Sequence, residues 1–227
     1  IVTYNYSKTT SIAMTCVYFL INYTLLFHYL QMGKNNRKGK SEVLDTHKLD
    51  KLIHFLPQTH HKLIASICRY TACRIGEAVQ LTWEDIRNYG DKKKIYFPKE
   101  ITKGKLNPRE IPIPEELYDQ LMQFKVECSH LKAENIEPKC YLFKSRNPNE
   151  HFSVRGFQHA LKAALERSNV IGASSHSFRR TCLTTAHNGK APLRHLMEIS
   201  GHKSLKTLQE YLDVTDEDKD KVVNLFV

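Results

Sequence analysis

The sequence predicts a mainly helical protein that carries a small three-stranded antiparallel β-sheet, an α+β fold. Apolar residues recur with the helical spacing of three or four over 46–81 and again after Pro114. Between these two stretches the spacing changes to two, which is typical of strands with one buried face. The change of period places the sheet between two helical parts of one domain.

The helical part before the sheet contains two predicted segments. Thr46 is the candidate N-cap of the first helix, which stops before Pro57 because proline disfavours a helical residue in front of it. A longer helical stretch covers 59–81, and Arg74 lies in it near a break before Gly76.

Three short strands are predicted next. They are Trp83–Ile86, Lys94–Phe97 and Glu110–Ile113. Pro112 confines the last strand to an edge of the sheet, because proline cannot donate a hydrogen bond to a neighbouring strand. The turn between the last two strands holds Lys103, Gly104 and Lys105.

Helices return after the sheet. They run from Pro114 to about Glu127, from Phe157 to Glu166, from Ser174 to Asn188 and from Pro192 to Gly201. Ser204 can then cap a third short helix in this last region, which carries Tyr211.

Composition narrows the class of protein. With 41% hydrophobic and 26% charged residues, the chain of 227 residues is neither disordered nor collagen-like. The net charge of +10 favours a polyanionic partner, nucleic acid ahead of an anionic membrane. The six cysteines form no C-x-x-C motif and no zinc-site spacing with histidines, so we expect reduced thiols in an intracellular protein without a metal site.

The first 41 residues differ from the rest. Residues 11–32 contain no charge and are strongly apolar, which fits a membrane span by length, but polar residues interrupt them and favour a helix that packs on protein. The stretch 33–41 is a basic linker, either a solvated loop or a strap along DNA. We therefore expect 1–41 to be a leader or the remnant of another domain; the start at Ile1 favours a fragment.

One cluster of polar residues stands out between residues 176 and 211. His176 and Arg179 lie one helical turn apart and so point to the same side. His202 follows Gly201 directly, and Tyr211 lies nine residues further on. Two imidazoles, a guanidinium and a phenol can therefore converge, as a site that handles phosphate requires.

Arg74 completes a signature. Taken alone, Arg74 would be interpreted as half of a surface ion pair with Glu77, three residues on. Arg74, His176-x-x-Arg179, Gly201-His202 and Tyr211 together resemble the tyrosine recombinase (phage integrase) family over residues 42–214. This resemblance implies an integrase-type catalytic domain at 42–214, followed by a tail helix at 215–227.

The resemblance also implies roles in breaking a DNA phosphodiester. Arg74 and Arg179 would hold the nonbridging oxygens, and two arginines suit this because their planar donors stay charged at neutral pH. Tyr211 would be the nucleophile that forms a 3′-phosphotyrosyl bond. His176 would act as its general base and His202 would donate a hydrogen bond to the phosphate.

Further roles concern basic and acidic residues around this set. Lys103 matches the lysine that protonates the leaving 5′-oxygen, with Lys99 and Lys105 as rivals or as plain contacts to DNA. Glu77 would orient the site. Arg180 would be structural or would contact the DNA backbone.

The resemblance therefore implies a site-specific DNA recombinase without a cofactor, metal ion or small-molecule substrate. Its partner would be double-stranded DNA, on which four copies assemble through the tail, with a monomer when free. The expected location is the cytoplasm, at the nucleoid, with membrane anchoring by 11–32 disfavoured. The alternatives are a type IB topoisomerase and a DNA-binding protein without activity. Because only 1–41 precede the catalytic pattern, we also expect weak binding to DNA.

Overall fold

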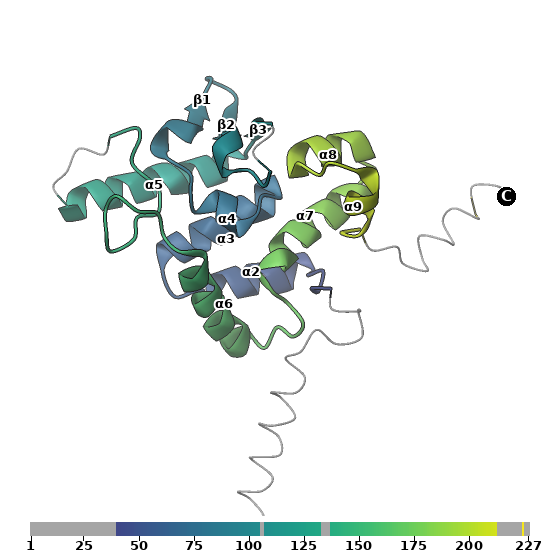
Figure 1. Cartoon of the computed structure of the whole chain (residues 1–227). Helices are drawn as coiled ribbons and strands as arrows, with labels where there is room; N and C mark the ends of the chain where they lie inside the picture. Colours follow the sequence, from purple (N-terminus) through teal and green to yellow (C-terminus); the bar gives the residue numbers. More distant parts are fainter. Residues whose placement is uncertain (1–39, 105–106, 133–136, 213–223, 225–227) are drawn as a thin grey trace, which may run out of the picture.

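The computed structural model describes residues 40–104, 107–132, 137–212 and 224 (Figure 1). Its helices are α2 (Thr46–His54), α3 (Thr59–Thr71), α4 (Ile75–Ala78), α5 (Glu115–Lys132), α6 (Val154–Ser168), α7 (Ser175–Asn188), α8 (Leu193–Ser200) and α9 (Leu205–Gln209). Its strands are β1 (Ile86–Asn88), β2 (Lys93–Phe97) and β3 (Arg109–Pro112), and two short 3-10 helices are η1 (Trp83–Asp85) and η2 (Lys99–Ile101). The predicted class, mainly helical with a three-stranded antiparallel sheet, is confirmed. The predictions for 1–39 and, apart from Asn224, for the tail fall outside the described residues.

Helix α3 forms the centre of the fold. It packs against α2, α4, α5 and α7 (Figure 1). Eight of its thirteen residues are buried: His61, Leu63, Ile64, Ala65, Ser66, Ile67, Cys68 and Thr71. Because four helices pack around α3, the position of its C-terminal end is fixed within the fold. That end in turn positions the residues that follow it, including Arg74.

The helical stretch predicted over 59–81 does break before Gly76, but the break begins earlier than expected, because α3 already ends at Thr71. Ala72 adopts the left-handed conformation with φ of 51° and ends the helix. Arg74 then has extended dihedral angles and becomes the N-cap of α4. The break leaves the Ala72 carbonyl free of the helix, where it accepts a hydrogen bond from Arg179.

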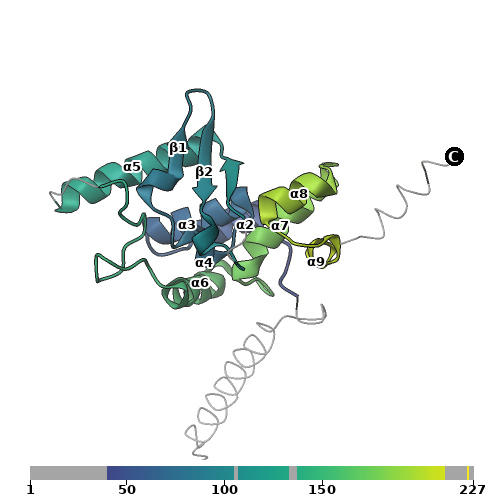
Figure 2. The same cartoon turned by 45° about the horizontal axis from the view of Figure 1, so that its top comes forward.

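The sheet has the order β1-β2-β3 with both pairs antiparallel. Ile95 lies opposite Ile86 on one side and Ile111 on the other, so the apolar residues share the face that packs on the helices. Figure 2 shows β1 and β2 extending from the helical body as a hairpin.

The first strand begins three residues later than predicted and ends two residues later. The expected strand Trp83–Ile86 is the 3-10 helix η1 followed by β1. The carboxylate of Asp85 accepts hydrogen bonds from the backbone N–H and the hydroxyl of Thr82, both at 2.8 Å. This cap winds the backbone into a turn, and Trp83 is buried from that turn rather than from a strand.

Two other boundaries also differ. Asp45, not Thr46, caps α2, because its carboxylate accepts the backbone N–H of Lys48 at 2.8 Å. Tyr211 does not lie on α9, which ends at Gln209. The Tyr211 N–H instead donates to the Leu208 carbonyl in the turn beyond the helix, at 2.8 Å.

Helix α7 is hydrogen-bonded to the first residues of the described chain. The Leu44 N–H donates to the hydroxyl of Thr181 at 2.9 Å, and the Arg180 guanidinium donates to the Ser41 carbonyl at 2.8 Å. The Glu42 N–H donates to the Gly172 carbonyl in the loop before α7 at 2.9 Å. Residues 41–44 are therefore an integral part of the domain.

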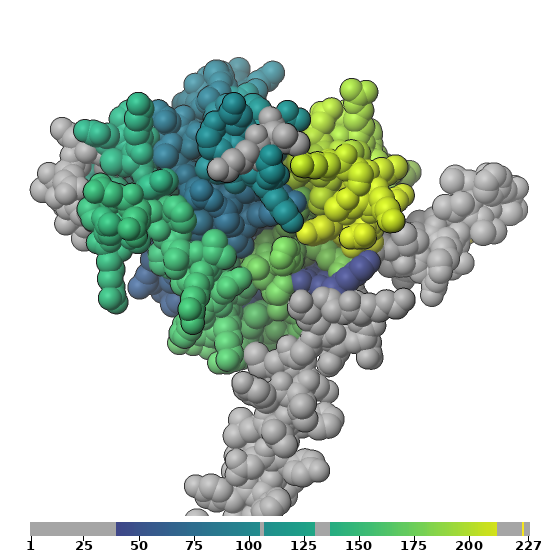
Figure 3. All heavy atoms as spheres, in the orientation of Figure 1, coloured from purple at the N-terminus to yellow at the C-terminus, as the bar shows by residue number. Residues whose placement is uncertain are grey.

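Helices α8 and α9 pack on α7 around a second hydrophobic cluster, separate from the main core. Its buried members are Ala72, Leu183, Leu196, Leu208 and Leu212. Helix α8 also contacts β3, and Figure 3 shows the C-terminal helices (yellow) directly beside the strands (teal). The sheet and the C-terminal helices thus face each other.

Among the described residues, no helix combines the length and the apolar character that crossing a bilayer requires.

Candidate active site

The candidate site is an open cleft of about 870 Å³ between the sheet on one side and, on the other, α8 with the loop that follows it. Arg74, Glu77, Lys103, Arg109, His202 and Lys203 are among the residues that line it. A smaller hollow of about 340 Å³ adjoins it on the side of α7, and Arg74, Glu77 and Lys103 line both hollows. These three residues therefore stand at the junction of the two.

Arg74 is held at this junction by Glu77. The Glu77 carboxylate accepts the Arg74 backbone N–H at 3.0 Å and its Nη1 at 3.1 Å. The Glu77 side chain is only 3% exposed, while that of Arg74 is 26% exposed. The ion pair considered for Arg74 exists, but its carboxylate is buried, so it orients the arginine toward the cleft.

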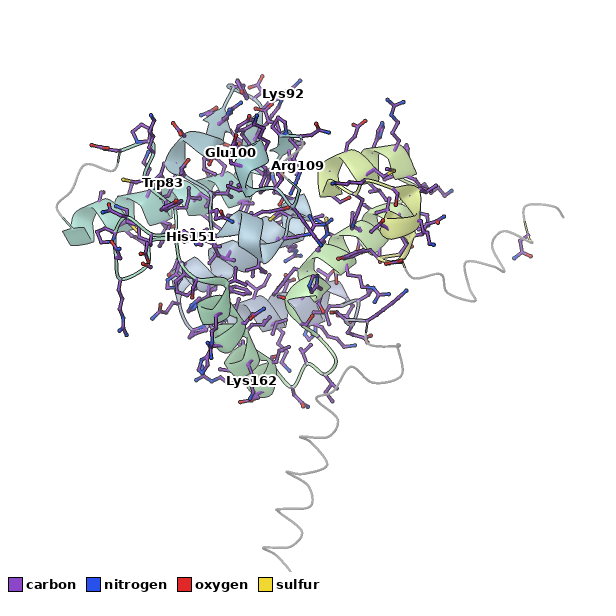
Figure 4. The ribbon with its side chains drawn as sticks, in the orientation of Figure 1. Trp83, Lys92, Glu100, Arg109, His151 and Lys162 are labelled. Atoms are coloured by element: carbon purple, nitrogen blue, oxygen red, sulfur yellow. The ribbon has the colours of Figure 1, made fainter. Side chains whose placement is uncertain are left out.

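Arg109, on β3, is a site residue that the sequence interpretation missed. Its Nη2 donates to Oε2 of Glu77, and its guanidinium carbon lies 4.6 Å from the centre of the Phe97 ring. Figure 4 labels Arg109 in the region between the sheet and α8. The alternation of Ile111 and Ile113 contained a signal, because Arg109 shares their parity and so their face of the strand.

The electrostatics explain why Glu77 stays ionised. Burial alone would raise its pKa, but Arg109 and then Arg74 outweigh that effect and lower the pKa below the ordinary value. A charged Glu77 holds both arginines by charge-assisted hydrogen bonds.

Arg179 forms the floor of the site. It is 1% exposed, and its two terminal nitrogens donate to the carbonyls of Ala72 and Ser200, the second at 2.8 Å. Burial, and then the charge of Arg74, lower the pKa of Arg179 to about 10, so it stays charged at neutral pH. Its Nε–H is buried and has no hydrogen-bond partner among the described residues.

His202 packs against Arg179 in the neutral form. Its Nε2 lies 3.0 Å from Nη2 of Arg179, which can only donate, so this ring nitrogen accepts and carries no proton. Its Nδ1 therefore carries the proton and donates to the Ser200 hydroxyl at 2.7 Å. Burial and the charge of Arg179 lower the pKa of His202 to about 3.

Tyr211 packs against both His202 and Arg179. Its ring lies 4.8 Å from the ring of His202 and 5.3 Å from the guanidinium carbon of Arg179, measured to the ring centre. The backbone carbonyl of Tyr211 accepts a hydrogen bond from Thr184 on α7 at 3.3 Å. Tyr211 is beside the predicted partners, yet it is not among the residues that line either hollow.

The lysines predicted around the site differ in where they lie. Lys103 is exposed in the turn before β3, and Lys99 is exposed on η2. Lys105 lies outside the described residues. Lys203 was not predicted, but its ammonium lies close above Gly104, where an added Cβ would be 2.9 Å from Nζ.

His176 and Arg180, both on α7, have different surroundings. His176 is exposed in the first turn and lines the smaller hollow together with Arg74, Lys103 and Arg179. Arg180 is 3% exposed and is engaged with the Ser41 carbonyl. Its burial supports the structural interpretation and speaks against a contact with DNA.

The described residues contain no group of three or more histidines, cysteines, aspartates or glutamates arranged to hold a metal ion. The five cysteines in the described ranges, Cys68, Cys73, Cys128, Cys140 and Cys182, are free thiols.

Comparison with known proteins gives a consistent result. The model of the phage integrase family matches residues 42–218. The tyrosine recombinase XerC of Bacillus subtilis is 28% identical over 151 residues, which are 65% of this chain and 47% of that protein. The prophage ps2 probable integrase of Lactococcus lactis is 24% identical over 223 residues, which are 86% of this chain and 57% of that protein. The chain thus spans about half the length of these relatives.

Solved structures share the fold. The XerH site-specific recombinase bound to its palindromic difH substrate has a TM-score of 0.68 at 17% identity, covering 85% of this chain and 55% of that one. The XerA recombinase has a TM-score of 0.65 at 20% identity, and the match covers 82% of this chain and 65% of that one. The catalytic domain of bacteriophage HP1 integrase has a TM-score of 0.55 at 21% identity, covering 76% and 87%.

Proposed function

Because this chain belongs to the phage integrase family, we propose that it cuts and rejoins DNA strands at specific sites through a covalent bond to Tyr211. The observation that carries the proposal is the convergence of residues from three separate parts of the chain. Arg74 lines one hollow with Arg179 and the other with His202, and Tyr211 packs on both Arg179 and His202. The names of the relatives, a tyrosine recombinase and an integrase, support it. So do fold neighbours that were solved with DNA, XerH and the Tn1549 transposon integrase.

The reaction exchanges one phosphodiester for another. The Tyr211 oxygen attacks phosphorus, a bond from this oxygen to phosphorus forms, and the bond from phosphorus to the 5′-oxygen breaks. His176 accepts the phenolic proton, and Lys103 supplies a proton to the leaving 5′-oxygen. A 5′-hydroxyl then attacks the phosphotyrosine and reverses both steps, so strand joining needs no ATP.

The cations of the cleft supply the stabilisation. Attack on a DNA phosphate adds negative charge to its nonbridging oxygens, and preorganised donors stabilise such charge by several kcal/mol. Arg74 is the best placed donor because its guanidinium is anchored on Glu77 while its side chain is 26% exposed. Lys203 would contact the same or the next phosphate beside Lys103.

We propose that the described arrangement of these residues precedes catalysis and must change before cleavage. Arg179 is engaged with two backbone carbonyls and with His202, and Tyr211 packs on the His202 ring outside the cleft. For His202 to donate to a phosphate, its proton must move to Nε2, and Arg179 must release that nitrogen. We propose that a phosphate entering beside Arg74 draws the Arg179 donors toward itself and frees the turn that carries Tyr211.

Assembly is a separate part of the proposal. Double-stranded DNA would be the partner, with Lys99 and Lys105 near its backbone and four copies joined through the tail at 215–227. The net charge of +10 supports a polyanionic partner.

The test is a covalent trap. A library of nicked duplexes with randomised sequence around the nick lets the cut fragment diffuse away, so that a cleaving protein stays attached to DNA. Wild-type protein should yield an adduct that survives denaturation, and its DNA should be enriched in one sequence. Tyr211→Phe should yield none while it retains binding. An adduct without sequence enrichment would indicate a topoisomerase, and binding without any adduct would indicate a DNA-binding protein without activity.

A further inference from the structure

Arg109 lies between the two halves of the cleft and touches both. We propose that Arg109 is a positioning residue, which holds Glu77 and through it Arg74, and which fixes the Gly201–His202 backbone relative to them. This inference rests on the proposed function and adds to the site a residue that acts without contacting the reacting phosphate.

The first observation is the shared carboxylate. Oε1 of Glu77 accepts Nη1 of Arg74, whereas Oε2 accepts both the Arg74 backbone N–H and Nη2 of Arg109. The side chains of Glu77 and Arg109 are 3% and 10% exposed, so this pair is largely shielded from water. Without Arg109 the buried carboxylate would lose a cation, and its hold on Arg74 would weaken.

The second observation concerns Gly201, the left-handed C-cap of α8 with φ of 67°. A Cβ added there would lie 3.0 Å from Nη1 of Arg109 and 3.7 Å from its guanidinium carbon. The guanidinium therefore packs directly against the Gly201 backbone, and the next residue is His202. Arg109 thus sets the distance between β3 and the loop that carries the histidine.

The third observation is the contact between Arg109 and the aromatic ring of Phe97. The guanidinium carbon of Arg109 lies 4.6 Å from the centre of the buried Phe97 ring. A planar guanidinium can stack on a ring while it donates at its edge, and an ammonium cannot do both. We therefore expect lysine to be a poor substitute.

These contacts favour positioning over direct binding of phosphate. Nη2 of Arg109 is committed to Glu77, and Nη1 faces Gly201. Its side chain is 10% exposed, compared with 26% for Arg74. Arg74 remains the group that faces the ligand, and Arg109 acts through it.

The experiment measures the rate of adduct formation on two suicide duplexes of a sequence that the wild-type protein cleaves. One carries an ordinary scissile phosphate, and the other a methylphosphonate, which lacks the negative charge that Arg74 would neutralise. On the ordinary phosphate, Arg109→Gln should slow the reaction by about 100-fold, the order of magnitude that a misplacement of about 1 Å costs. On the methylphosphonate, Arg109→Gln and Arg74→Ala should each react within a few-fold of the wild-type rate. Arg109→Lys should behave like Arg109→Gln on both duplexes.

Arg87→Gln is the matched control. Arg87 lies on the same sheet, pairs with Glu110 at 3.1 Å and stacks on Tyr96 at 3.8 Å, but it is not among the residues that line the cleft. Its rate should equal that of the wild type on both duplexes. An Arg109→Gln deficit that is equal on the two duplexes, or absent, would overturn the positioning role.

A second measurement needs no DNA. Urea unfolding of Arg109→Gln, Glu77→Gln and the double variant should be non-additive, with the double variant no less stable than the less stable single one. Additive losses would overturn the coupling between the two residues. A wild-type protein that forms no adduct would instead refute the proposed function itself, and with it any part of Arg109 in the reaction.

Discussion

At the scale of single residues, Arg74 and Arg179 have different surroundings. Arg74 keeps a quarter of its side chain exposed, while Arg179 is buried and holds the carbonyls of Ala72 and Ser200. Removal of Arg74 leaves Glu77 still paired with Arg109. Removal of Arg179 leaves buried carbonyls without donors, and each such group is costly.

This difference separates catalysis from stability. Arg74→Ala should slow adduct formation by about 100- to 1,000-fold, as losing a preorganised donor does, and should cost about 1 kcal/mol or less of unfolding free energy. Arg179→Ala should lose the activity as well as about 2–4 kcal/mol. Urea unfolding and the covalent trap measure the two effects. Equal stability losses in both variants would contradict the assignment of Arg179 as a structural tie.

His202 gives a prediction about pH. Its folded pKa of about 3 lies below the ordinary value of 6.5, so below pH 6.5 the unfolded chain binds a proton that the folded chain does not. The unfolding free energy should therefore fall as pH is lowered from about 6.5 toward 3, by up to about 1.4 kcal/mol per pH unit from this residue. In His202→Gln the slope between pH 6 and pH 5 should be smaller by about that amount. Identical slopes would mean that His202 is not neutral and buried.

At the scale of elements, the breaks and ends of helices decide the geometry of the site. The left-handed residues Ala72 and Gly201 end α3 and α8, and each end presents backbone to the site. The Ala72 carbonyl binds Arg179, and the Gly201 backbone supports Arg109.

Gly201→Ala tests the second of these ends, with Gly90→Ala as its matched control. Both glycines have positive φ, 67° and 76°, so alanine should cost about 1–2 kcal/mol of strain at either position. At Gly90 an added Cβ meets nothing within 4 Å, whereas at Gly201 it meets Arg109. We expect only Gly201→Ala to slow adduct formation, by about tenfold or more. Equal rates in the two variants would show that contact with Arg109 is unimportant.

Sequence patterns predicted most elements, because helical and strand periods persist wherever one face is buried. They failed where a single side-chain contact outweighs periodicity. The Asp85 carboxylate caps the 3-10 helix that begins at Trp83, where a strand was predicted. Helix α3 ends at Ala72, although no glycine or proline marks that position in the sequence. The motif residues were predicted by the resemblance, but Arg109 was not, since its role depends on the approach of β3 to α8.

At the scale of the whole molecule, the site lies between two hydrophobic clusters, and Ile199 packs against both. The main core supports α3, α4 and the sheet, while the second cluster supports α8, α9 and Tyr211. Helix α7 contributes to both, through Phe178 and Leu183. A site that lies between two clusters can change its geometry without unfolding either of them, as the proposed release of Tyr211 requires.

The net charge of +10 gives a prediction at this scale. Binding to duplex DNA should weaken linearly in a plot of log affinity against log salt, because each neutralised phosphate releases counterions. Lys103→Ala should reduce that slope by about 0.9 if Lys103 neutralises one phosphate. Titrations at several salt concentrations measure it. A slope near zero for the wild type would contradict a binding mode dominated by phosphate contacts.

The identity of the residue that becomes attached to DNA is the most direct test of the account. The trapped adduct is digested with nuclease and protease, and mass spectrometry locates the remaining nucleotide on a peptide. The chain contains eleven tyrosines, so attachment specifically at Tyr211 would not be expected by chance. We predict a 3′-phosphotyrosyl nucleotide on Tyr211. A nucleotide on any other residue, or one joined through its 5′-phosphate, would contradict the account.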